Sequence, residues 1–270
     1  MKTQKLNNGL EIPRLGLGVW KSENGKETID AVHWAVEAGY RHIDTAKAYG
    51  NEEAVGKAVR TAAVPREDLW VTTKVWNDSI RDGKTTEALD NSLQRLGLDY
   101  IDLVLLHWPV EGRVAAWQAL EKALAAGKVK SIGVSNFMDD HLQEIIEAGD
   151  VVPAVNQIEY HPYLTQADAI TESDQHGIAI TAWSPLMQGH FLDEPVFAEI
   201  GKKYDKTAAQ VVLRWCLQND VIVIPKSVHR GRIIENGQLF DFELGEEDMV
   251  AIDQLERDKR FGPDPHNFDF

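Results

Sequence analysis

The 270-residue sequence predicts an α/β fold, a (β/α)8 TIM barrel that forms a single domain over residues 1–270. Near-continuous apolar runs alternate with segments of helical period, and such runs are typical of parallel strands that helices cover on both faces. About eight strand–helix units fill the chain, which is the number that this barrel requires. Four glycines each follow a helical pattern and precede an apolar run, as helix C-caps do: Gly39, Gly97, Gly127 and Gly177.

The expected elements follow one another in a regular order. The opening residues QKLNNGLEIP predict a small hairpin around Asn8 and Gly9, which would close the bottom of the barrel. Strands are expected at residues 14–20, 40–44, 68–74, 100–108, 129–136, 154–160, 177–183 and 221–227. The clearest helical periods lie at residues 26–39, 85–97, 113–127 and 206–218. No low-complexity segment or proline-rich linker marks a domain boundary.

A doubly wound open sheet is the competing architecture for this alternation. It would normally carry G-x-G-x-x-G in the first strand–helix turn. The matching segment, GLGVWK, supplies Gly16 and Gly18 but has Lys21 in place of the third glycine. We therefore prefer the barrel and interpret the two glycines as sites of close backbone packing.

Charge and cysteine content restrict the class of protein. A formal net charge of −15 repels nucleic acid phosphates and anionic membranes, so neither is an expected partner. The one cysteine, Cys216, cannot form an internal disulfide, and its helical apolar context predicts a buried position. No apolar run is long enough to span a bilayer, and the N-terminus lacks the hydrophobic stretch of a signal peptide. We therefore expect a cytoplasmic protein, and we expect it to be a monomer.

Polar or stacking side chains stand at the expected C-terminal end of nearly every strand, where barrel enzymes place their chemistry. Each such polar group must lose water and find a partner when it is buried, so a scaffold without function would rarely carry them all. The positions are Asp44 with Tyr49, Lys74, His107, Ser135 with Asn136, Gln157, Trp183 with Ser184, and Lys226.

Asp44, Tyr49, Lys74 and His107 make chemical sense as a group. A phenol, with a pKa of about 10, donates a proton poorly at neutral pH unless its anion is stabilised, which an adjacent ammonium does. We expect Asp44 to keep Lys74 charged and oriented, and His107 to orient a substrate oxygen. The set suits protonation of a carbonyl oxygen while hydride arrives at its carbon. Each residue alone has a structural explanation, but their coincidence at three successive strand ends favours function.

A second group of residues is basic. Lys226, His229, Arg230 and Arg232 cluster between the last expected strand and a helix, in a chain that is otherwise strongly acidic. Such local positive charge suggests a bound phosphate, aided by the amides of the helix N-terminus. A solvated helix face is the alternative. Position favours the phosphate, because barrel phosphate sites commonly follow the last two strands.

The sequence resembles the aldo-keto reductase family through seven segments in the expected order: HIDTAKAYGNE, TTKVWN, LLHWP, GVSNF, VNQIEYHP, AWSPL and IPKSVHRGRIIEN. The resemblance extends from the N-terminal hairpin to the final residues GPDPHNFDF. Within the family, the chain is most similar to bacterial reductases that act on glyoxal-type aldehydes or on 2,5-diketo-gluconate.

The resemblance implies NADPH-dependent carbonyl reduction, with Tyr49 as the general acid, Lys74 and Asp44 tuning it, and His107 orienting the carbonyl. It also implies that NADPH lies extended across the barrel mouth. The implied contacts are Ser135, Asn136, Gln157 and Trp183 for the nicotinamide; Ser184, Leu186 and Gln188 for the pyrophosphate; Lys226, Ser227, Val228 and Arg232 for the 2′-phosphate; and Glu235 and Asn236 for the adenine.

Three positions depart from the family pattern. Trp183 stands where tyrosine is frequent, which still permits stacking. His229 stands where threonine or arginine is common, and Gly231 where an acid or other polar residue is usual. The last two changes leave NADH as a weaker alternative cofactor.

The family places the substrate pocket at Trp20, Trp76 and Trp108, with Asn77, Tyr49 and His107 beside them, giving an apolar wall with few polar anchors. The connection after His107 is short where large members insert a loop, so we expect a comparatively open pocket for small aldehydes, dicarbonyls or keto-sugars. The last residues, 257–270, are either a frayed end or, as in the family, a flap beside the pocket, and we favour the flap.

Two other functional classes stay open at this point. A barrel aldolase or isomerase would use Lys74 as a Schiff-base nucleophile. A non-catalytic, nicotinamide-sensing regulatory subunit would bind the cofactor with negligible turnover. No metal is predicted, because His141 and His161 have no companions at metal-ligand spacing.

Overall fold

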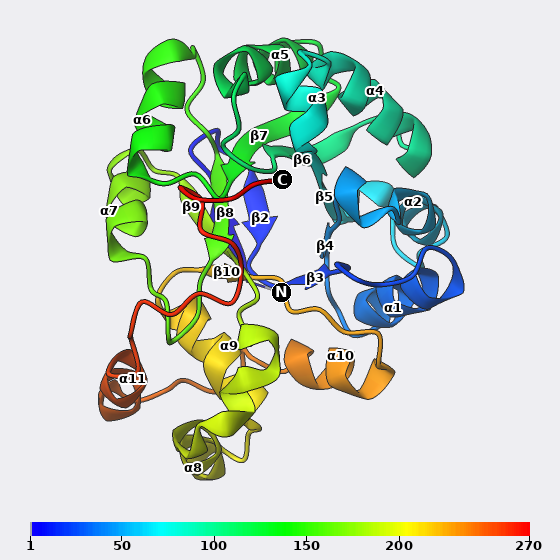
Figure 1. The fold of residues 1–270 in the computed structure, drawn as a ribbon. Helices are drawn as coiled ribbons and strands as arrows, with labels where there is room; N and C mark the ends of the chain where they lie inside the picture. Colours follow the sequence, from blue (N-terminus) through cyan, green and yellow to red (C-terminus); the bar gives the residue numbers. More distant parts are fainter. Residues whose placement is uncertain (1) are drawn as a thin grey trace.

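The computed structural model describes residues 2–270 and contains a parallel barrel of eight strands surrounded by helices (Figure 1). The strands are β3 (Gly16–Gly18), β4 (His42–Asp44), β5 (Trp70–Val75), β6 (Ile101–Leu106), β7 (Val129–Ser135), β8 (Val155–Glu159), β9 (Ala179–Trp183) and β10 (Ile222–Val223). Each strand pairs in parallel with its neighbour in the sequence. Parallel bridges from Leu15 to Val223 and from Gly18 to Lys226 join the first barrel strand to the last. The predicted barrel is therefore confirmed, and an open doubly wound sheet is excluded.

The helices lie outside the strands, as the two-sided burial of the apolar runs predicts (Figure 1). They are α1 (Lys26–Glu37), α2 (Glu52–Arg60), α3 (Asn77–Arg81), α4 (Thr85–Leu96), α5 (Arg113–Ala125), α6 (Asp139–Ala148), α7 (Ala167–Gln175), α8 (Pro195–Tyr204), α9 (Ala208–Gln218), α10 (Arg230–Gly237) and α11 (Glu246–Asp253). Three 3-10 helices accompany them: η1 (Lys47–Tyr49), η2 (Arg66–Asp68) and η3 (Met187–Asp193). The four clearest helical periods of the sequence correspond to α1, α4, α5 and α9.

The last strand is shorter than the sequence predicts. Residues 221–227 read as one strand, but β10 covers two residues. Pro225 has no N–H to donate, and the pairing with the first strand resumes only as an isolated bridge between Gly18 and Lys226. The first and last strands approach closely at Gly18. A Cβ at this position would lie 2.7 Å from the main-chain oxygen of Ile224, so a larger residue would clash. The interpretation of this glycine as a site of close packing is confirmed.

The N-terminal hairpin covers the end of the barrel where the strands begin. Its strands, β1 (Thr3–Lys5) and β2 (Glu11–Pro13), pair antiparallel around a turn at Asn8 and Gly9. Asn8 Nδ2 donates to Ser131 Oγ at 2.8 Å, and Asn7 Nδ2 donates to the oxygen of Pro153 at 2.9 Å. Because these partners lie at or just before the start of β7 and β8, the hairpin closes the barrel bottom as predicted.

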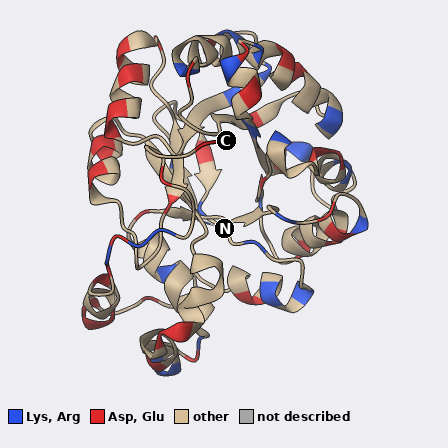
Figure 2. Ribbon diagram, in the orientation of Figure 1, with Lys and Arg blue, Asp and Glu red and all other residues tan. Residues whose placement is uncertain are grey.

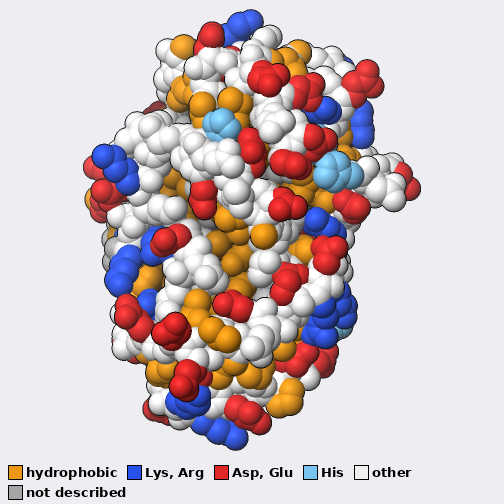
Figure 3. Space-filling view, turned by 90° about the vertical axis from the view of Figure 1, so that its left-hand side faces the viewer, with side chains coloured by type: hydrophobic (Ala, Val, Ile, Leu, Met, Phe, Trp, Pro, Cys, Tyr) orange, Lys and Arg blue, Asp and Glu red, His pale blue; other side chains and the backbone are white. Residues whose placement is uncertain are grey.

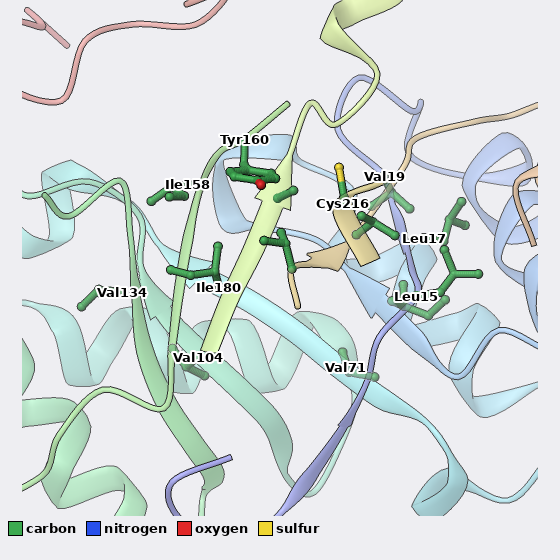
Figure 4. Close-up of a cluster of buried hydrophobic side chains, with 14 of the residues drawn as sticks. Leu15, Leu17, Val19, Val71, Val104, Val134, Ile158, Tyr160, Ile180 and Cys216 are labelled. Carbon is green, nitrogen blue, oxygen red and sulfur yellow. The ribbon is translucent and has the colours of Figure 1, made fainter. Parts of the chain in front are cut away.

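The core is continuous between the strands and the inner faces of the helices. Figure 4 shows buried side chains from several strands gathered with Cys216 of α9. Tyr160 stacks on Trp215 with ring centroids 5.2 Å apart, which joins the end of β8 to α9. Cys216 is fully buried, as expected, and burial raises the pKa of its thiol, so it is chemically inert.

Charged residues lie mainly on the outer helices and loops (Figure 2). On the face drawn in Figure 3, acidic side chains are spread widely, whereas basic ones gather toward the edges. This distribution agrees with the net charge of −15. Among residues 2–270, no helix is both long enough and apolar enough to cross a membrane.

The C-terminal tail, residues 257–270, runs across the end of the barrel opposite the hairpin (Figure 1). Buried Glu159 accepts hydrogen bonds from the main-chain nitrogens of Phe261 and Gly262, at 2.7 and 3.2 Å. Farther along, His266 Nε2 lies 3.0 Å from Asp140 Oδ1 at the start of α6. The tail is therefore ordered over the barrel mouth, which confirms the flap and rules out a frayed end.

Candidate active site

The four residues that the sequence grouped as catalytic lie together at the barrel mouth. Asp44 ends β4, Lys74 lies in β5, His107 follows β6 and Tyr49 belongs to η1. Lys74 Nζ donates to Asp44 Oδ1 at 2.6 Å and to Tyr49 Oη at 3.3 Å. The rings of Tyr49 and His107 meet edge to face, with centroids 5.8 Å apart. Parallel strands end at the same edge of the barrel, which is why residues from three strands converge here.

Burial and pairing oppose each other at Lys74 and Tyr49. Burial favours the neutral amine of Lys74, but Asp44 and Tyr49 outweigh it, so the pKa of Lys74 is raised and the ammonium persists. Burial also raises the pKa of Tyr49, and Lys74 offsets only part of that rise. Lys74 therefore stabilises the phenolate, as expected, but the net pKa of Tyr49 stays above its usual value. The phenol keeps its proton at neutral pH.

His107 is held as a neutral imidazole. Burial and the nearby Lys74 ammonium lower its pKa well below 6.5. Within residues 2–270, its Nδ1 atom is buried and has no hydrogen-bond partner. The ring also packs edge-on against Trp76, with centroids 5.0 Å apart. A neutral imidazole fixed in this way can donate a hydrogen bond to a carbonyl oxygen without adding a charge.

Three of the four residues expected at the nicotinamide are connected to the group of Asp44, Tyr49, Lys74 and His107. Gln157 Nε2 donates to Asp44 Oδ2 at 2.8 Å, and Ser135 Oγ donates to the main-chain oxygen of Gln157 at 2.8 Å. Asn136 Nδ2 donates to the main-chain oxygen of His107 at 3.0 Å. All three are buried: Ser135 ends β7, Asn136 follows it, and Gln157 lies in the middle of β8. A hydroxyl and two amides thus stand beside Asp44 and His107.

Unusual backbone conformations mark the same region. Asn136, Ser184 and Gln188 have φ angles of 63°, 50° and 52°, in the left-handed region that non-glycine residues seldom adopt. Backbone strain of this kind gathers at binding sites. Trp183 Nε1 donates to Asn136 Oδ1 at 2.8 Å, which joins β9 to the group around Asn136. Leu186 lies between Ser184 and Gln188, at the start of η3.

The basic cluster lies at the N-terminus of α10. His229 precedes the first residue of α10, and its main-chain nitrogen donates to Ser227 Oγ at 3.1 Å. Arg230 lies 3.6 Å from Glu37, whereas Lys226 and Arg232 are exposed and form no ion pair within residues 2–270. These two cations are available to an anion. Val228 is half-buried between them.

The two residues expected at the adenine differ in their surroundings. Asn236 is buried inside α10. Glu235 Oε1 accepts a hydrogen bond at 2.9 Å from Oγ1 of Thr207, the N-cap residue of α9. A ligand contact from Glu235 must therefore use its other oxygen or break this bond.

Aromatic side chains line the mouth beside His107. The ring of Phe270 stacks on Trp76, with centroids 5.8 Å apart and planes 5° apart, and Phe268 packs against Trp108 at 4.9 Å. Asn77 Nδ2 donates to the main-chain oxygen of Phe270 at 3.3 Å. Trp20 stands apart from this group and is 43% exposed. The tail thus covers part of the surface that the sequence assigned to the substrate.

Sequence reasoning missed two residues that place the tail. Arg81 Nη2 donates to the oxygen of Phe270 at 2.7 Å, and Glu159 binds two tail amides. Neither residue has a sequence signal of its own. Arg81 reads as a surface arginine and Glu159 as one acid in a strand, because their partners are 189 and 102 residues away along the chain.

The tail also brings three possible metal ligands together. Asp140, His141 and His266 lie close enough to share an ion, a grouping that sequence spacing could not reveal. His141 Nδ1 accepts a hydrogen bond from the main-chain nitrogen of Met138 at 3.2 Å, and His266 binds Asp140 directly. These bonds give the cluster a structural role in holding the tail to α6. The absence of a metal stays a prediction.

Comparison with known proteins places these features in a family. A profile described as "Aldo/keto reductase family" matches residues 14–257. Glyoxal reductase of Bacillus subtilis (strain 168) is 50% identical over 264 residues, covering 97% of this chain and 96% of that protein.

Two solved structures extend the comparison. An aldo-keto reductase from a deep-sea metagenome library is 42% identical, with a TM-score of 0.95, over 99% of this chain and 100% of that one. A Bombyx mori aldo-keto reductase in complex with NADP is 36% identical, with a TM-score of 0.89, over 96% of this chain and 94% of that one.

Proposed function

This chain belongs to the aldo/keto reductase family, and on that premise we propose that it reduces small aldehydes, dicarbonyls or keto-sugars to alcohols with NADPH. One observation carries the proposal: the Lys74 ammonium lies 2.6 Å from the Asp44 carboxylate and 3.3 Å from the Tyr49 oxygen, at the barrel mouth. This geometry supports Tyr49 as the proton donor. The cytoplasm, where NADPH is kept reduced, and a monomeric state are part of the proposal.

The mechanism requires a proton, an orienting hydrogen bond and a hydride. NADPH, when bound, supplies the hydride to the carbonyl carbon. Tyr49 donates its proton to the carbonyl oxygen, and Lys74 stabilises the phenolate that remains. The neutral imidazole of His107 donates to the same oxygen and fixes its direction. Asp44 holds Lys74 in place and keeps it charged.

The residue types fit NADPH along the barrel mouth. The hydroxyl of Ser135 and the amides of Asn136 and Gln157 match the donors and acceptors of a carboxamide. Trp183 offers a flat indole face for stacking. The solved Bombyx mori relative is in complex with NADP, which supports this cofactor by similarity.

The Schiff-base alternative is disfavoured by the state of Lys74. A nucleophilic lysine needs a free amine, which usually follows from a lowered pKa. Lys74 is buried against a carboxylate, and its pKa is raised, so it carries no lone pair at neutral pH. A regulatory subunit would bind the cofactor with negligible turnover, so a measurement of turnover distinguishes it from a reductase.

The function is tested by following NADPH and NADH absorbance against methylglyoxal, an aromatic aldehyde and a keto-sugar. We expect NADPH oxidation with several small carbonyls and slower oxidation of NADH. Cofactor binding with negligible turnover on every carbonyl would instead favour the regulatory subunit. Activity confined to one bulky, steroid-like ketone would contradict the open pocket.

The phosphate assignment predicts a cofactor-selective effect of Arg232→Ala. A guanidinium bound to a phosphate contributes about 1.5–3 kcal/mol, so NADPH binding should weaken by roughly tenfold or more while NADH binding stays within about twofold. Titration of protein fluorescence with each cofactor measures both constants. Lys57→Ala on α2 removes the same charge from an exposed position elsewhere and should leave the ratio unchanged. Equal weakening of both cofactors by Arg232→Ala would place the 2′-phosphate elsewhere.

A further inference from the structure

The first and last residues of α3 hold the end of the tail beside the group of Asp44, Tyr49, Lys74 and His107. Arg81 Nη2 and Asn77 Nδ2 both donate to the main-chain oxygen of Phe270, at 2.7 and 3.3 Å. Arg81 makes only a weak additional contact, with Asp78 at 4.0 Å. The hydrogen bond to Phe270 is therefore the principal polar contact of the Arg81 side chain within residues 2–270.

These hydrogen bonds place the Phe270 ring against the two tryptophans of the mouth. Phe270 lies parallel to Trp76 at 5.8 Å and edge-on to Trp108 at 5.1 Å. Trp76 in turn packs edge-on against His107 at 5.0 Å. The Trp76 ring therefore lies between Phe270 and His107, the residue proposed to orient the carbonyl.

The two attachments of the tail differ in exposure. Glu159 is fully buried where it binds Phe261 and Gly262, whereas Arg81 and Phe270 are both about two-fifths exposed. Hydrogen bonds at an exposed site compete with water and open more readily than buried ones. Release of Phe270 therefore leaves the attachment at Glu159 intact.

A substrate ring and the Phe270 ring require the same surface. A flat or aromatic group attached to the carbonyl gains most by stacking on Trp76, which Phe270 already covers. A two- or three-carbon dicarbonyl needs no such surface, because its whole length is shorter than the indole ring. The attached tail therefore discriminates between these two classes of carbonyl.

We propose that Arg81 is a positioning residue that sets substrate size, by holding the Phe270 ring on Trp76 and so favouring small dicarbonyls over aromatic aldehydes. The inference rests on the proposed reductase function. Arg81 touches neither the carbonyl nor the cofactor; it acts through Phe270. Asn77 adds the second hydrogen bond to the same oxygen.

The test compares kcat/KM for methylglyoxal and for an aromatic aldehyde in the full-length wild type, Arg81→Ala, Arg81→Lys and Phe270→Ala. We expect Arg81→Ala to raise the ratio of aromatic aldehyde to methylglyoxal at least about fivefold, mainly through a lower KM for the aromatic substrate. Phe270→Ala should shift the ratio in the same direction. Arg81→Lys, which keeps a cationic donor, should restore most of the wild-type ratio.

A matched control and a measurement independent of catalysis complete the design. Arg60→Ala removes a guanidinium that donates to the main-chain oxygen of Leu96 on the outer helices, so it should leave the ratio unchanged. Hydrogen–deuterium exchange should accelerate in residues 263–270 of Arg81→Ala and stay slow at Phe261 and Gly262.

Two outcomes separate this inference from the proposed function. If the wild type reduces methylglyoxal but Arg81→Ala keeps the substrate ratio within twofold, the role of Arg81 is overturned while the reductase function stands. If the wild type oxidises no NADPH with any carbonyl, the function itself is overturned, and the substrate-size role with it.

Discussion

Replacement of Tyr49 by phenylalanine is expected to lower the rate of carbonyl reduction by about 10²–10⁴-fold while leaving NADPH affinity nearly unchanged. The substitution removes one oxygen, which lies 3.3 Å from Lys74 and is the proposed proton donor. The ring can keep its edge-to-face packing on His107, so the site should retain its shape. Single-turnover reduction of methylglyoxal and fluorescence titration with NADPH measure the two quantities.

The same experiment includes a pH test in the wild type. Burial keeps the pKa of Tyr49 above 10.0 and, with Lys74, keeps that of His107 well below 6.5. Tyr49 loses its proton only when the pH rises through its raised pKa, and His107 gains one only when the pH falls through its lowered pKa. The rate of the reduction step should therefore be flat between about pH 7 and 9. A variant that keeps most of its rate without the Tyr49 hydroxyl would show that another group supplies the proton.

Replacement of Lys74 by methionine is expected to cost both stability and activity. Lys74 is 1% exposed, and its ammonium donates to Asp44, to the main-chain oxygen of Thr45 and to Tyr49. Methionine leaves the Asp44 carboxylate buried, with Gln157 as its one remaining side-chain donor within residues 2–270. Breaking a buried ion pair in this way lowers the free energy of unfolding by about 3–5 kcal/mol. Urea denaturation measures the change.

The double variant Asp44→Asn with Lys74→Met separates the two effects. It removes both charges and keeps an acceptor for Gln157, so most of the lost stability should return. Activity should not return, because Tyr49 then lacks the ammonium that stabilises its anion. A single Lys74→Met variant as stable as the wild type would contradict a buried pair, and an active double variant would remove Lys74 from the mechanism.

Most of the barrel could be predicted because its signals are local. A strand buried on both faces appears as a continuous apolar run, and a covering helix appears as a period of 3.6 residues. The hairpin at Asn8 and Gly9 carries its own turn signal. Strand lengths were less predictable: β3 and β10 cover three and two residues of apolar runs that are longer, because an apolar run does not show where the hydrogen-bonded ladder stops.

The proximity of the catalytic group could also be predicted, since parallel strands end at one edge of the barrel. The direction of the pKa shift of Tyr49 could not be predicted, because the sequence identifies the charged neighbour, Lys74, but not how deeply the phenol is buried. Lys74 lowers the pKa of Tyr49, yet burial raises it by more. The relative size of these opposing effects depends on how many atoms surround the phenol.

The sequence by itself determined the eight strand–helix units, the closing hairpin and the polar groups at the strand ends, because periodicity and strand-end position are properties of neighbouring residues. The tertiary structure alone decided how the tail is held: Arg81 holds Phe270 on Trp76, and Glu159 anchors Phe261. These contacts join residues 102 to 194 positions apart, and each is one polar or aromatic pair without a repeating pattern. Only the folded chain brings such pairs within contact distance.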